Sequence, residues 1–211
     1  MDFLFNTNAQ FFIAAYLVGG IPFGLLLAKK FAGVDVKSSG SKSIGATNVL
    51  RVVKETNPSL AKKLGAATLA LDAIKGVLVL AVAYFMGLSE ATLWGISVLA
   101  VIGHCYSPYL GFEGGKGVAT ACGILFGINW ILGAATLSTW IIVAMFMRYS
   151  SLAALAAAVF GPIYFVFLFG FQPMGIALLI VSLLLVWRHR SNIQNLLNGT
   201  EGRIGSKKKS P

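Results

Sequence analysis

The sequence predicts an all-α, polytopic membrane protein with seven transmembrane helices, the N-terminus outside and the C-terminus cytoplasmic. Three observations lead to this fold class. Hydrophobic residues make up 57% of the 211 residues and charged residues only 11%, with a mean hydropathy of +0.80. Apolar runs approach the roughly 20 residues that a helix needs to cross about 30 Å of hydrocarbon. The basic residues outside the apolar stretches lie in segments that fall on one side of the membrane when the chain crosses it seven times.

Seven apolar stretches, separated by turn signals, are the expected spans. They cover residues 9–31, 64–86, 90–107, 117–128, 129–147, 151–170 and 173–187. The fourth is short, so its length alone also allows a re-entrant segment. Pro22 and Pro162 lie inside apolar stretches, where membrane helices tolerate a kink. Asp2 precedes the first stretch without a basic n-region, which favours a retained span over a cleaved signal peptide.

The distribution of charge decides whether the fourth stretch crosses. Seventeen Lys and Arg residues against seven Asp and Glu give a net charge of +10. Most basic residues fall within 29–63 or after residue 187, and Lys116 and Arg148 lie between later stretches. With seven spans these residues share one face, which the positive-inside rule makes cytoplasmic. A fourth stretch that did not cross would put Arg148 and the basic tail on opposite sides. The excess positive charge therefore requires no nucleic-acid partner.

Length and cysteine content restrict the remaining classes. We expect a single integral membrane domain over residues 1–211, with 198–211 a polar cytoplasmic tail. Cys105 and Cys122 lie in or beside apolar stretches, and no CxxC spacing occurs. They are therefore interpreted as packing residues rather than a disulfide or a zinc site.

The segment GSKSIGATNVLR, residues 40–51, is the first candidate binding segment. It places hydroxyls, an amide and two cations around two glycines. Small hydroxyl residues with glycine form concave runs of backbone N–H groups that bind anions. Arg51 could clamp a phosphate or a carboxylate with two hydrogen bonds. The alternative is an ordinary polar loop in which Lys42 and Arg51 meet lipid headgroups.

The segment GHCYSPYLGFEGGKGVAT, residues 103–120, contains a glycine-rich loop with a lysine. A nucleotide P-loop requires G-x4-G-K-[ST]. Gly111 is one residue too close to Gly115-Lys116, and Gly117 replaces the hydroxyl residue, so a nucleotide site is excluded. The loop nevertheless stands at the N-terminus of an apolar helix, where free N–H groups and the helix dipole favour an anion.

Four further polar residues are interpreted as structural. Asp72 and Lys75 lie inside the second span at i, i+3 spacing, which favours a buried ion pair over a transport path for an organic phosphate. His104 is interpreted as a hydrogen-bonding residue rather than a base, and Glu113 as a partner that orients Lys116. A transporter or a lipid-binding scaffold remains an alternative to an enzyme.

The segment RHRSNIQNLLNGTEGRIG, residues 188–205, is the third candidate. Its arginines and His189 close the last span, where a basic anchor is the default interpretation. Asn192, Asn198 and Glu201 are spaced so that a short amphipathic helix would return them to the interface. Three separate cytoplasmic segments can thus bind oxyanions, which suits an amphiphilic substrate that carries a phosphate.

Five motifs resemble, in order along the chain, the bacterial membrane acyl-phosphate:glycerol-3-phosphate acyltransferase family. They are GGIPFGLLLAK, GATNVLR, LDAIKG, and the two long segments at 103–120 and 188–205. The resemblance implies a seven-span fold with its N-terminus outside, in the bacterial inner membrane, and an active site at the cytoplasmic face. The implied partners are glycerol 3-phosphate, a fatty acyl phosphate and membrane lipid, without a metal, a cofactor or nucleic acid.

In the implied reaction, the 1-hydroxyl of glycerol 3-phosphate attacks the acyl carbonyl of the acyl phosphate, and lysophosphatidic acid and phosphate leave. The proton acceptor is either the donor phosphate or His189. The resemblance implies catalytic roles for Ser41, Lys116, His189 and Asn192, and substrate-binding roles for Thr47, Asn48, Arg51, Gly114, Gly115, Gly117, Ser151 and Glu201. The glycine loop and the first segment would hold the acyl phosphate, and Arg51 with the third segment would hold glycerol 3-phosphate.

The chain departs from this family in the first segment. The family usually reads GSGN where this chain has Gly40-Ser41-Lys42-Ser43. We expect activity to survive this change, because Lys42 adds a cation to the segment.

Overall fold

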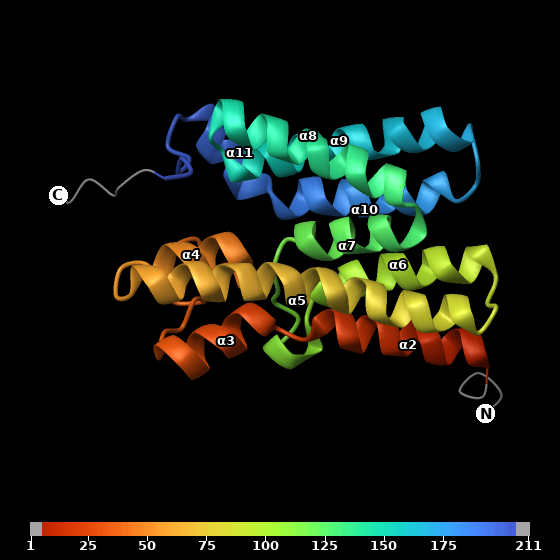
Figure 1. Ribbon diagram of the computed structural model, residues 1–211, viewed down its shortest axis with the longest axis horizontal. Coiled ribbons are helices and arrows are strands. Elements are labelled where there is room, and N and C mark those ends of the chain that lie inside the picture. Colours follow the sequence, from red (N-terminus) through yellow and green to blue (C-terminus); the bar gives the residue numbers. More distant parts are fainter. Residues whose placement is uncertain (1–5, 206–211) are drawn as a thin grey trace. The chain divides into compact units, whose positions relative to one another are not determined.

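The protein is described here by a computed structural model that covers residues 6–205, and every regular element in this range is helical (Figure 1). The chain divides into two compact units, Met1–Ile128 and Asn129–Pro211. Unit 1 contains α2 (Thr7–Gly20), α3 (Phe23–Ala32), α4 (Ala46–Val53), α5 (Pro58–Phe85), α6 (Glu90–Cys105), the 3-10 turn η1 (Pro108–Leu110) and α7 (Val118–Ile128). Unit 2 contains α8 (Trp130–Met147), α9 (Ser150–Phe169), α10 (Gly175–Arg188) and α11 (Arg190–Leu197).

Each apolar stretch of the sequence forms a helix at the expected place. Five helical segments are long and apolar enough to cross a membrane, and α10 with α11 makes a sixth if this pair, bent by 56°, is one span. α7 is also apolar but has only 11 residues. An all-helical fold is therefore confirmed, whereas the count of seven spans stays a prediction.

The first span is broken where Pro22 interrupts it. α2 ends at Gly20, α3 begins at Phe23, and Ile21 between them has extended backbone with ψ 120°. Proline has no N–H and cannot continue the helical hydrogen bonds. Two side chains bind the carbonyl groups at this break: Ser107 Oγ, from the segment after α6, donates to the Gly20 carbonyl at 2.6 Å, and Lys75 Nζ of α5 donates to the Ile21 carbonyl at 2.8 Å.

Unit 1 is organised around α5, which packs against α2, α3, α4, α6 and α7 (Figure 1). Glycine permits the closest of these approaches, because a Cβ on Gly123 of α7 would overlap the Ala73 backbone of α5. The same holds for α2 and α6, where a Cβ on Gly19 would overlap the Ala100 backbone. Small residues at helix crossings are typical of membrane bundles, since they let the backbones meet.

The helix α4 corrects the interpretation of residues 46–53 as loop. Its residues Val49, Val52 and Val53 are buried against Leu25 of α3 and Leu64 of α5, within one apolar cluster. Eight residues are too few for a helix to be stable by itself. The apolar stripe packed on α3 and α5 therefore stabilises α4, and this short stripe is difficult to recognise beside the long apolar runs.

Unit 2 is organised around α9, which packs against α8, α10 and α11. Pro162 lies inside α9, as expected from the sequence, and the helix continues through it. Thr139 of α8 and Tyr164 of α9 share a hydrogen bond of 2.7 Å between their hydroxyls. α11 is the short helix that was expected after the last span.

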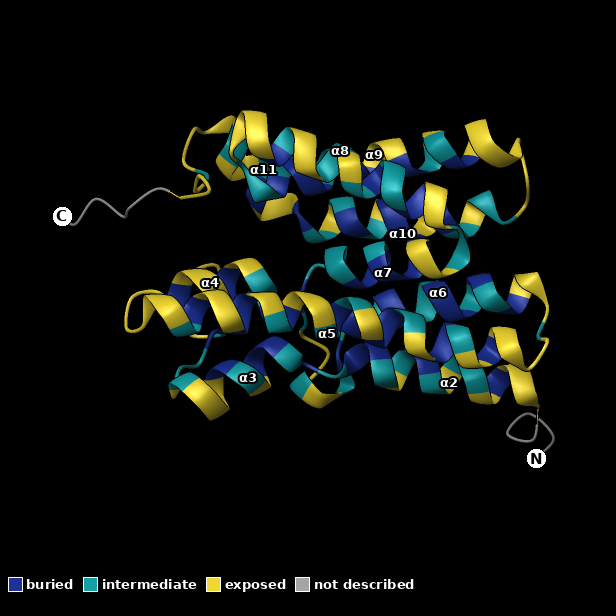
Figure 2. Cartoon of the chain, in the orientation of Figure 1, coloured by how far each residue is buried: buried dark blue, intermediate teal, exposed yellow. Residues whose placement is uncertain are grey.

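Large apolar side chains are exposed along the long helices of both units. Figure 2 colours exposed residues yellow, and they recur along these helices. Phe85 of α5 is 85% exposed and Phe167 of α9 is 89% exposed. A water-soluble protein rarely exposes apolar surface on this scale. Hydrocarbon is the solvent that suits these faces, because every backbone group inside a helix is already bonded. Asp2 and residues 206–211 of the polar tail predicted for 198–211 lie outside the described residues.

Candidate active site

Asn48 organises the loop of residues 33–45, which precedes α4 in unit 1. Its side chain is 2% exposed. Oδ1 accepts a hydrogen bond from the Ser41 N–H at 2.8 Å. Nδ2 lies 2.9 Å from the Val36 carbonyl, 3.2 Å from the Ser39 carbonyl and 2.8 Å from the Ser43 carbonyl. The side-chain amide thus links three carbonyl groups of the loop to α4. The expected contact between Asn48 and substrate stays a prediction.

The backbone N–H groups of this loop are largely used within the protein. The Lys42 N–H donates to the Ser39 carbonyl at 3.1 Å, and the Gly45 N–H donates to Ser43 Oγ at 3.3 Å. Together with the Ser41–Asn48 bond, these contacts engage three of the N–H groups that the expected backbone cradle would offer to an anion, and the cradle stays a prediction. The side chains of Ser41, Lys42, Thr47 and Arg51 are exposed.

The glycine loop of residues 111–117 turns sharply and then enters α7. Gly111, Phe112 and Gly117 all have positive φ, at 63°, 64° and 83°. Gly115 is buried against His104 of α6: its N–H donates to the His104 carbonyl at 3.0 Å, and a Cβ at this position would overlap the imidazole. Lys116, partly buried, follows directly and stands two residues before the first turn of α7.

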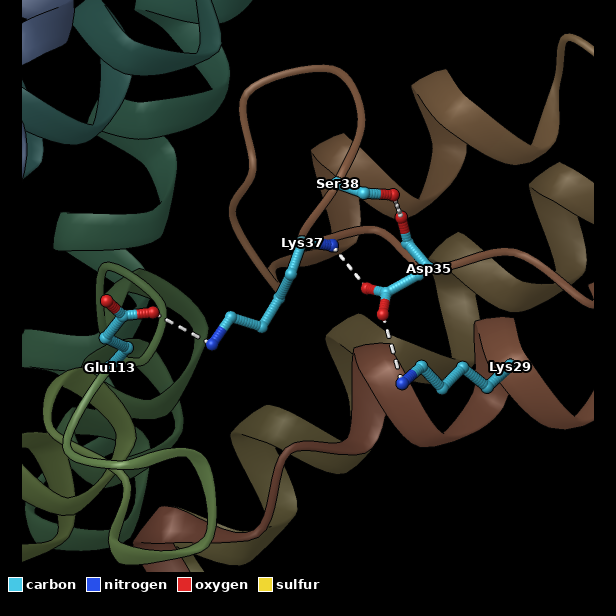
Figure 3. Close-up of polar contacts among 5 residues, drawn as sticks. All are labelled: Lys29, Asp35, Lys37, Ser38 and Glu113. Carbon is cyan, nitrogen blue, oxygen red and sulfur yellow. Dashed lines mark hydrogen bonds and ion pairs between the residues drawn. The ribbon is translucent and has the colours of Figure 1, made fainter.

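An ion pair joins the two loops of unit 1 (Figure 3). Lys37 Nζ lies 2.9 Å from Glu113 Oε2, and these residues are 76 positions apart in the chain. The sequence suggested Lys116 as the partner of Glu113, and the structure adds Lys37. This contact connects the segment that carries Ser41 with the segment that carries Lys116.

Asp35 holds the start of the same loop (Figure 3). Its carboxylate accepts a hydrogen bond from the Lys37 N–H at 2.8 Å and pairs with Lys29 Nζ of α3 at 3.0 Å. The backbone hydrogen bond first, and the Lys29 ammonium second, lower the pKa of Asp35 from its ordinary value of 3.8. The carboxylate therefore stays ionised at neutral pH, when it can hold both lysines.

Unit 2 brings three of the predicted residues together around one carboxylate oxygen. Ser151 Oγ, in the first turn of α9, donates to Glu201 Oε1 at 2.8 Å, and Asn192 Nδ2, in α11, donates to the same oxygen at 2.9 Å. Ser151 and Asn192 are buried, and Glu201 is half-buried. Hydrogen bonds to an ionised acceptor are the stronger kind, so the two donors fix the orientation of Glu201.

His189 lies at the junction of α10 and α11 and is 2% exposed. Its Nδ1 is 2.7 Å from the Leu185 carbonyl. A carbonyl can only accept, so Nδ1 carries the proton. In the neutral ring Nε2 then holds the lone pair, and this is the atom that could accept a proton or a substrate hydrogen bond.

The segment after α11 folds back onto the turn between α8 and α9. Arg203 Nε donates to the Tyr149 hydroxyl at 2.9 Å, and its guanidinium lies 5.4 Å from the centre of that ring. The Ile204 N–H donates to the Arg148 carbonyl at 2.6 Å, and Arg148 Nη2 donates to the Ile204 carbonyl at 3.1 Å. The hydrogen bond to Tyr149 raises the pKa of Arg203. These contacts hold the segment that carries Glu201.

Asp72 and Lys75 form the buried ion pair that their spacing predicted, at 2.7 Å. Lys75 is bound both to Asp72 and to the Ile21 carbonyl. These contacts favour the structural interpretation over a transport path. Among residues 6–205, no group of three His, Cys, Asp or Glu side chains is placed to hold a metal ion.

The sequence therefore identified the polar segments but not the contacts that hold them. Lys37 and Tyr149 were not singled out, although each holds a segment that carries predicted site residues. Lys37 is 76 residues from its partner and Tyr149 is 54 residues from its own. No local pattern marks such pairs.

Comparison with known proteins gives consistent results. The family model described as glycerol-3-phosphate acyltransferase matches residues 9–199. The glycerol-3-phosphate acyltransferase of Sulfurimonas denitrificans is 63% identical over 205 residues, which cover 97% of this chain and all of the relative. The corresponding protein of Aliarcobacter butzleri is 52% identical over 209 residues, with 97% and 100% covered.

Solved structures agree with the sequence relatives. The crystal structure of PlsY, an integral membrane glycerol 3-phosphate acyltransferase, in its glycerol 3-phosphate form superposes with a TM-score of 0.84 at 34% identity. The alignment covers 95% of this chain and 96% of that one. The lysophosphatidic acid form of PlsY gives a TM-score of 0.82 over the same shares. With its long apolar helices, the chain is a multi-pass membrane protein, and it belongs to the glycerol-3-phosphate acyltransferase family.

Proposed function

We propose that the protein transfers a fatty acyl group from an acyl phosphate to the 1-hydroxyl of glycerol 3-phosphate. The hydroxyl oxygen forms a bond to the acyl carbon, and the bond from that carbon to the phosphate oxygen breaks. The products are lysophosphatidic acid, which retains the acyl chain, and inorganic phosphate. This would be the first step of phospholipid synthesis. The related PlsY structures in glycerol 3-phosphate and lysophosphatidic acid forms support the acceptor and the product.

The observation that carries this proposal is the chemistry of the two polar clusters on otherwise apolar units. Unit 1 presents Ser41 and Thr47 on one loop and helix, and Lys116 on the glycine loop. Unit 2 presents the Ser151–Asn192–Glu201 cluster with His189. We assign the first cluster to the acyl phosphate, and the second, with Arg51, to glycerol 3-phosphate. Gly114, Gly115 and Gly117 belong to the same proposed phosphate site. A Cβ on Gly114 or Gly115 would overlap His104, and Gly117 has a φ of 83°, so side chains at these positions would displace the loop.

Positioning and electrostatics can supply the catalysis. An acyl phosphate is a mixed anhydride and is already activated, so a covalent enzyme intermediate is not needed. Holding two polyanions together is the main difficulty, and fixed cations reduce their repulsion while orienting the reacting atoms. Lys116 neutralises charge on the phosphate of the acyl donor and on glycerol 3-phosphate, and Glu201 accepts hydrogen bonds from glycerol hydroxyls.

The hydroxyl proton passes either to the leaving phosphate or to His189. The Nδ1 bond to Leu185 leaves Nε2 of the neutral ring as the possible acceptor. General-base catalysis typically contributes a factor of about 10² to 10⁴. Turnover of a His189→Ala variant close to the wild-type rate would exclude His189 as the base and leave the donor phosphate in that role.

We further propose that the two units act as one domain with seven spans, in the inner membrane, with the N-terminus outside and the polar clusters on the cytoplasmic side. The basic residues support this, since seven spans gather them on one face.

The 11 residues of α7 rise about 16 Å, about half of the hydrocarbon thickness. The glycine loop before α7 would then reach below the membrane surface, where an acyl chain can stay in lipid while its phosphate meets Lys116.

The experiment that tests the reaction uses purified protein reconstituted in lipid vesicles. Glycerol 3-phosphate and palmitoyl phosphate should yield lysophosphatidic acid, and chelation of divalent metals should leave the rate unchanged. Absence of product, together with glycerol 3-phosphate accumulating inside sealed vesicles, would indicate a transporter instead.

A further inference from the structure

Three ionisable side chains are buried together in unit 1 and have no role in the reaction described above. Asp72 and Lys75 of α5 are each 2% exposed, and His104 of α6 is 3% exposed. The Asp72–Lys75 pair is 2.7 Å long, and His104 Nδ1 lies 3.7 Å from the same Asp72 oxygen. The cluster therefore bridges the second span and the third.

Stability alone does not explain this cluster. Two charges that are removed from water lose hydration free energy, and their mutual attraction offsets this loss only in part. Replacing a buried ion pair by apolar residues therefore often leaves the stability of a protein unchanged or raises it. The cost is at least as great in a membrane span, where ionisable residues are rare. A buried pair kept at such a position is a candidate for function, and its contacts show what it could serve.

One side of the cluster holds the break in the first span. Lys75 Nζ donates to the Ile21 carbonyl at 2.8 Å and lies 5.8 Å from the centre of the Phe23 ring. Ser107, just after α6, donates to the neighbouring Gly20 carbonyl at 2.6 Å. Hydrogen bonds thus connect the break in the first span both to α5 and to the segment that leads into the glycine loop.

The other side of the cluster supports the glycine loop itself. The Gly115 N–H donates to the His104 carbonyl at 3.0 Å. A Cβ on Gly115 would overlap the imidazole Nε2, and one on Gly114 would overlap the His104 carbonyl. The imidazole therefore packs against Gly115, the residue that precedes Lys116, and Asp72 lies on the Nδ1 side of the ring.

We propose that Asp72, Lys75 and His104 are positioning residues for acyl transfer, which hold Gly115 and Lys116 in place by fixing the His104 ring against the glycine loop. The cluster sets the position of the loop relative to the broken first span and touches no reacting atom. This inference rests on the proposed function, because it assigns the glycine loop to the acyl phosphate.

The test uses a double variant, Asp72→Asn with Lys75→Met, which removes both charges together so that neither is left buried without its partner. In lipid nanodiscs, we expect the variant to fold with a thermal midpoint close to that of the wild type. Its kcat should fall about tenfold to hundredfold, the range that a misplacement of about 1 Å can produce. KM for glycerol 3-phosphate should change less than about threefold.

A second pair of variants keeps the test informative if the double variant does not fold. His104→Gln can place its amide nitrogen near the position of Nε2, the ring atom that a Cβ on Gly115 would meet first, and should keep most of the turnover, whereas His104→Ala should lose it. Hydrogen exchange in the peptide that contains Gly115 gives a readout without substrate. Exchange should become at least about tenfold faster in His104→Ala and in the double variant, because the His104 ring no longer holds Gly115 in place. Ser97→Ala is the matched control: Ser97 is buried in α6 and its hydroxyl donates to the Leu93 carbonyl of the same helix, so exchange and kcat should not change.

Wild-type turnover per folded molecule in the double variant or in His104→Ala, with unchanged exchange at Gly115, would overturn the proposal. A loss of turnover that is fully accounted for by the loss of folded protein, without rescue by His104→Gln, would overturn it as well. A wild-type protein that makes no lysophosphatidic acid would instead refute the proposed function. In that case hydrogen exchange still decides whether the cluster holds the loop.

Discussion

Lys42 is a single residue whose backbone conformation conflicts with its side chain. Its φ of 55° lies in the left-handed region, which costs a residue with a Cβ roughly 1 kcal/mol relative to glycine. We therefore expect Lys42→Gly to raise the stability of the protein by about 1 kcal/mol, measured as a higher thermal midpoint in nanodiscs. Lys54→Gly is the control, because Lys54 has φ −61° at the end of α4 and should lose stability. A lower midpoint for Lys42→Gly would show that the lysine side chain outweighs the strain.

Glu201 is the residue on which the hydrogen bonds of unit 2 converge. In a Glu201→Gln variant the amide oxygen can still accept from Ser151 and Asn192, but the charge is lost. A hydrogen bond to a charged group contributes about 1.5–3 kcal/mol. We expect KM for glycerol 3-phosphate to rise about tenfold or more, while KM for palmitoyl phosphate stays constant. Glu90→Gln, at an exposed acid in the first turn of α6, should change neither value. A rise confined to the palmitoyl phosphate KM would reverse the assignment of the cluster.

Among the elements, the two loops of unit 1 depend on each other through Lys37 and Glu113. The Lys37 side chain is 31% exposed and that of Glu113 is 75% exposed, so the pair is worth at most about 1 kcal/mol. We expect Lys37→Glu and Glu113→Lys each to lower kcat severalfold, and the charge-swapped double variant to recover most of that loss. Turnover measured at low and at high salt checks this, because salt screens the pair. Additive losses in the double variant would show that the two loops are not coupled.

The helices were predictable from the sequence where a long apolar run forces the structure. All seven apolar stretches form helices, because a helix bonds the backbone polar groups within its own segment when the surroundings are lipid. α4 was missed because its stabilising stripe is short and only acquires a partner when α3 and α5 pack against it. The anion-binding segments were found by composition, whereas the role of Asn48 as the centre of its loop depends on carbonyls up to 12 residues away. Contacts of this kind follow from the fold and leave no periodic signal.

For the molecule as a whole, the number of spans depends on whether α7 crosses the membrane. Seven spans put Asn129, between α7 and α8, outside, and Arg148, between α8 and α9, inside. We expect a cysteine introduced at position 129, in a background without Cys105 and Cys122, to react in whole cells with a maleimide that cannot cross the membrane. A cysteine at position 198 should react only after the cells are broken. Protection at position 129 in whole cells would mean that α7 is re-entrant.

The central claim is that an acyl phosphate, rather than a thioester, donates the acyl group to glycerol 3-phosphate. The most direct measurement follows both products of the reconstituted wild-type protein supplied with palmitoyl phosphate and, in parallel, with palmitoyl-CoA. We predict one lysophosphatidic acid per inorganic phosphate from palmitoyl phosphate, no product from palmitoyl-CoA, and a loss of at least about a hundredfold in kcat for Lys116→Ala. Lysophosphatidic acid formed from palmitoyl-CoA at an equal rate, or phosphate released without lysophosphatidic acid, would contradict the account.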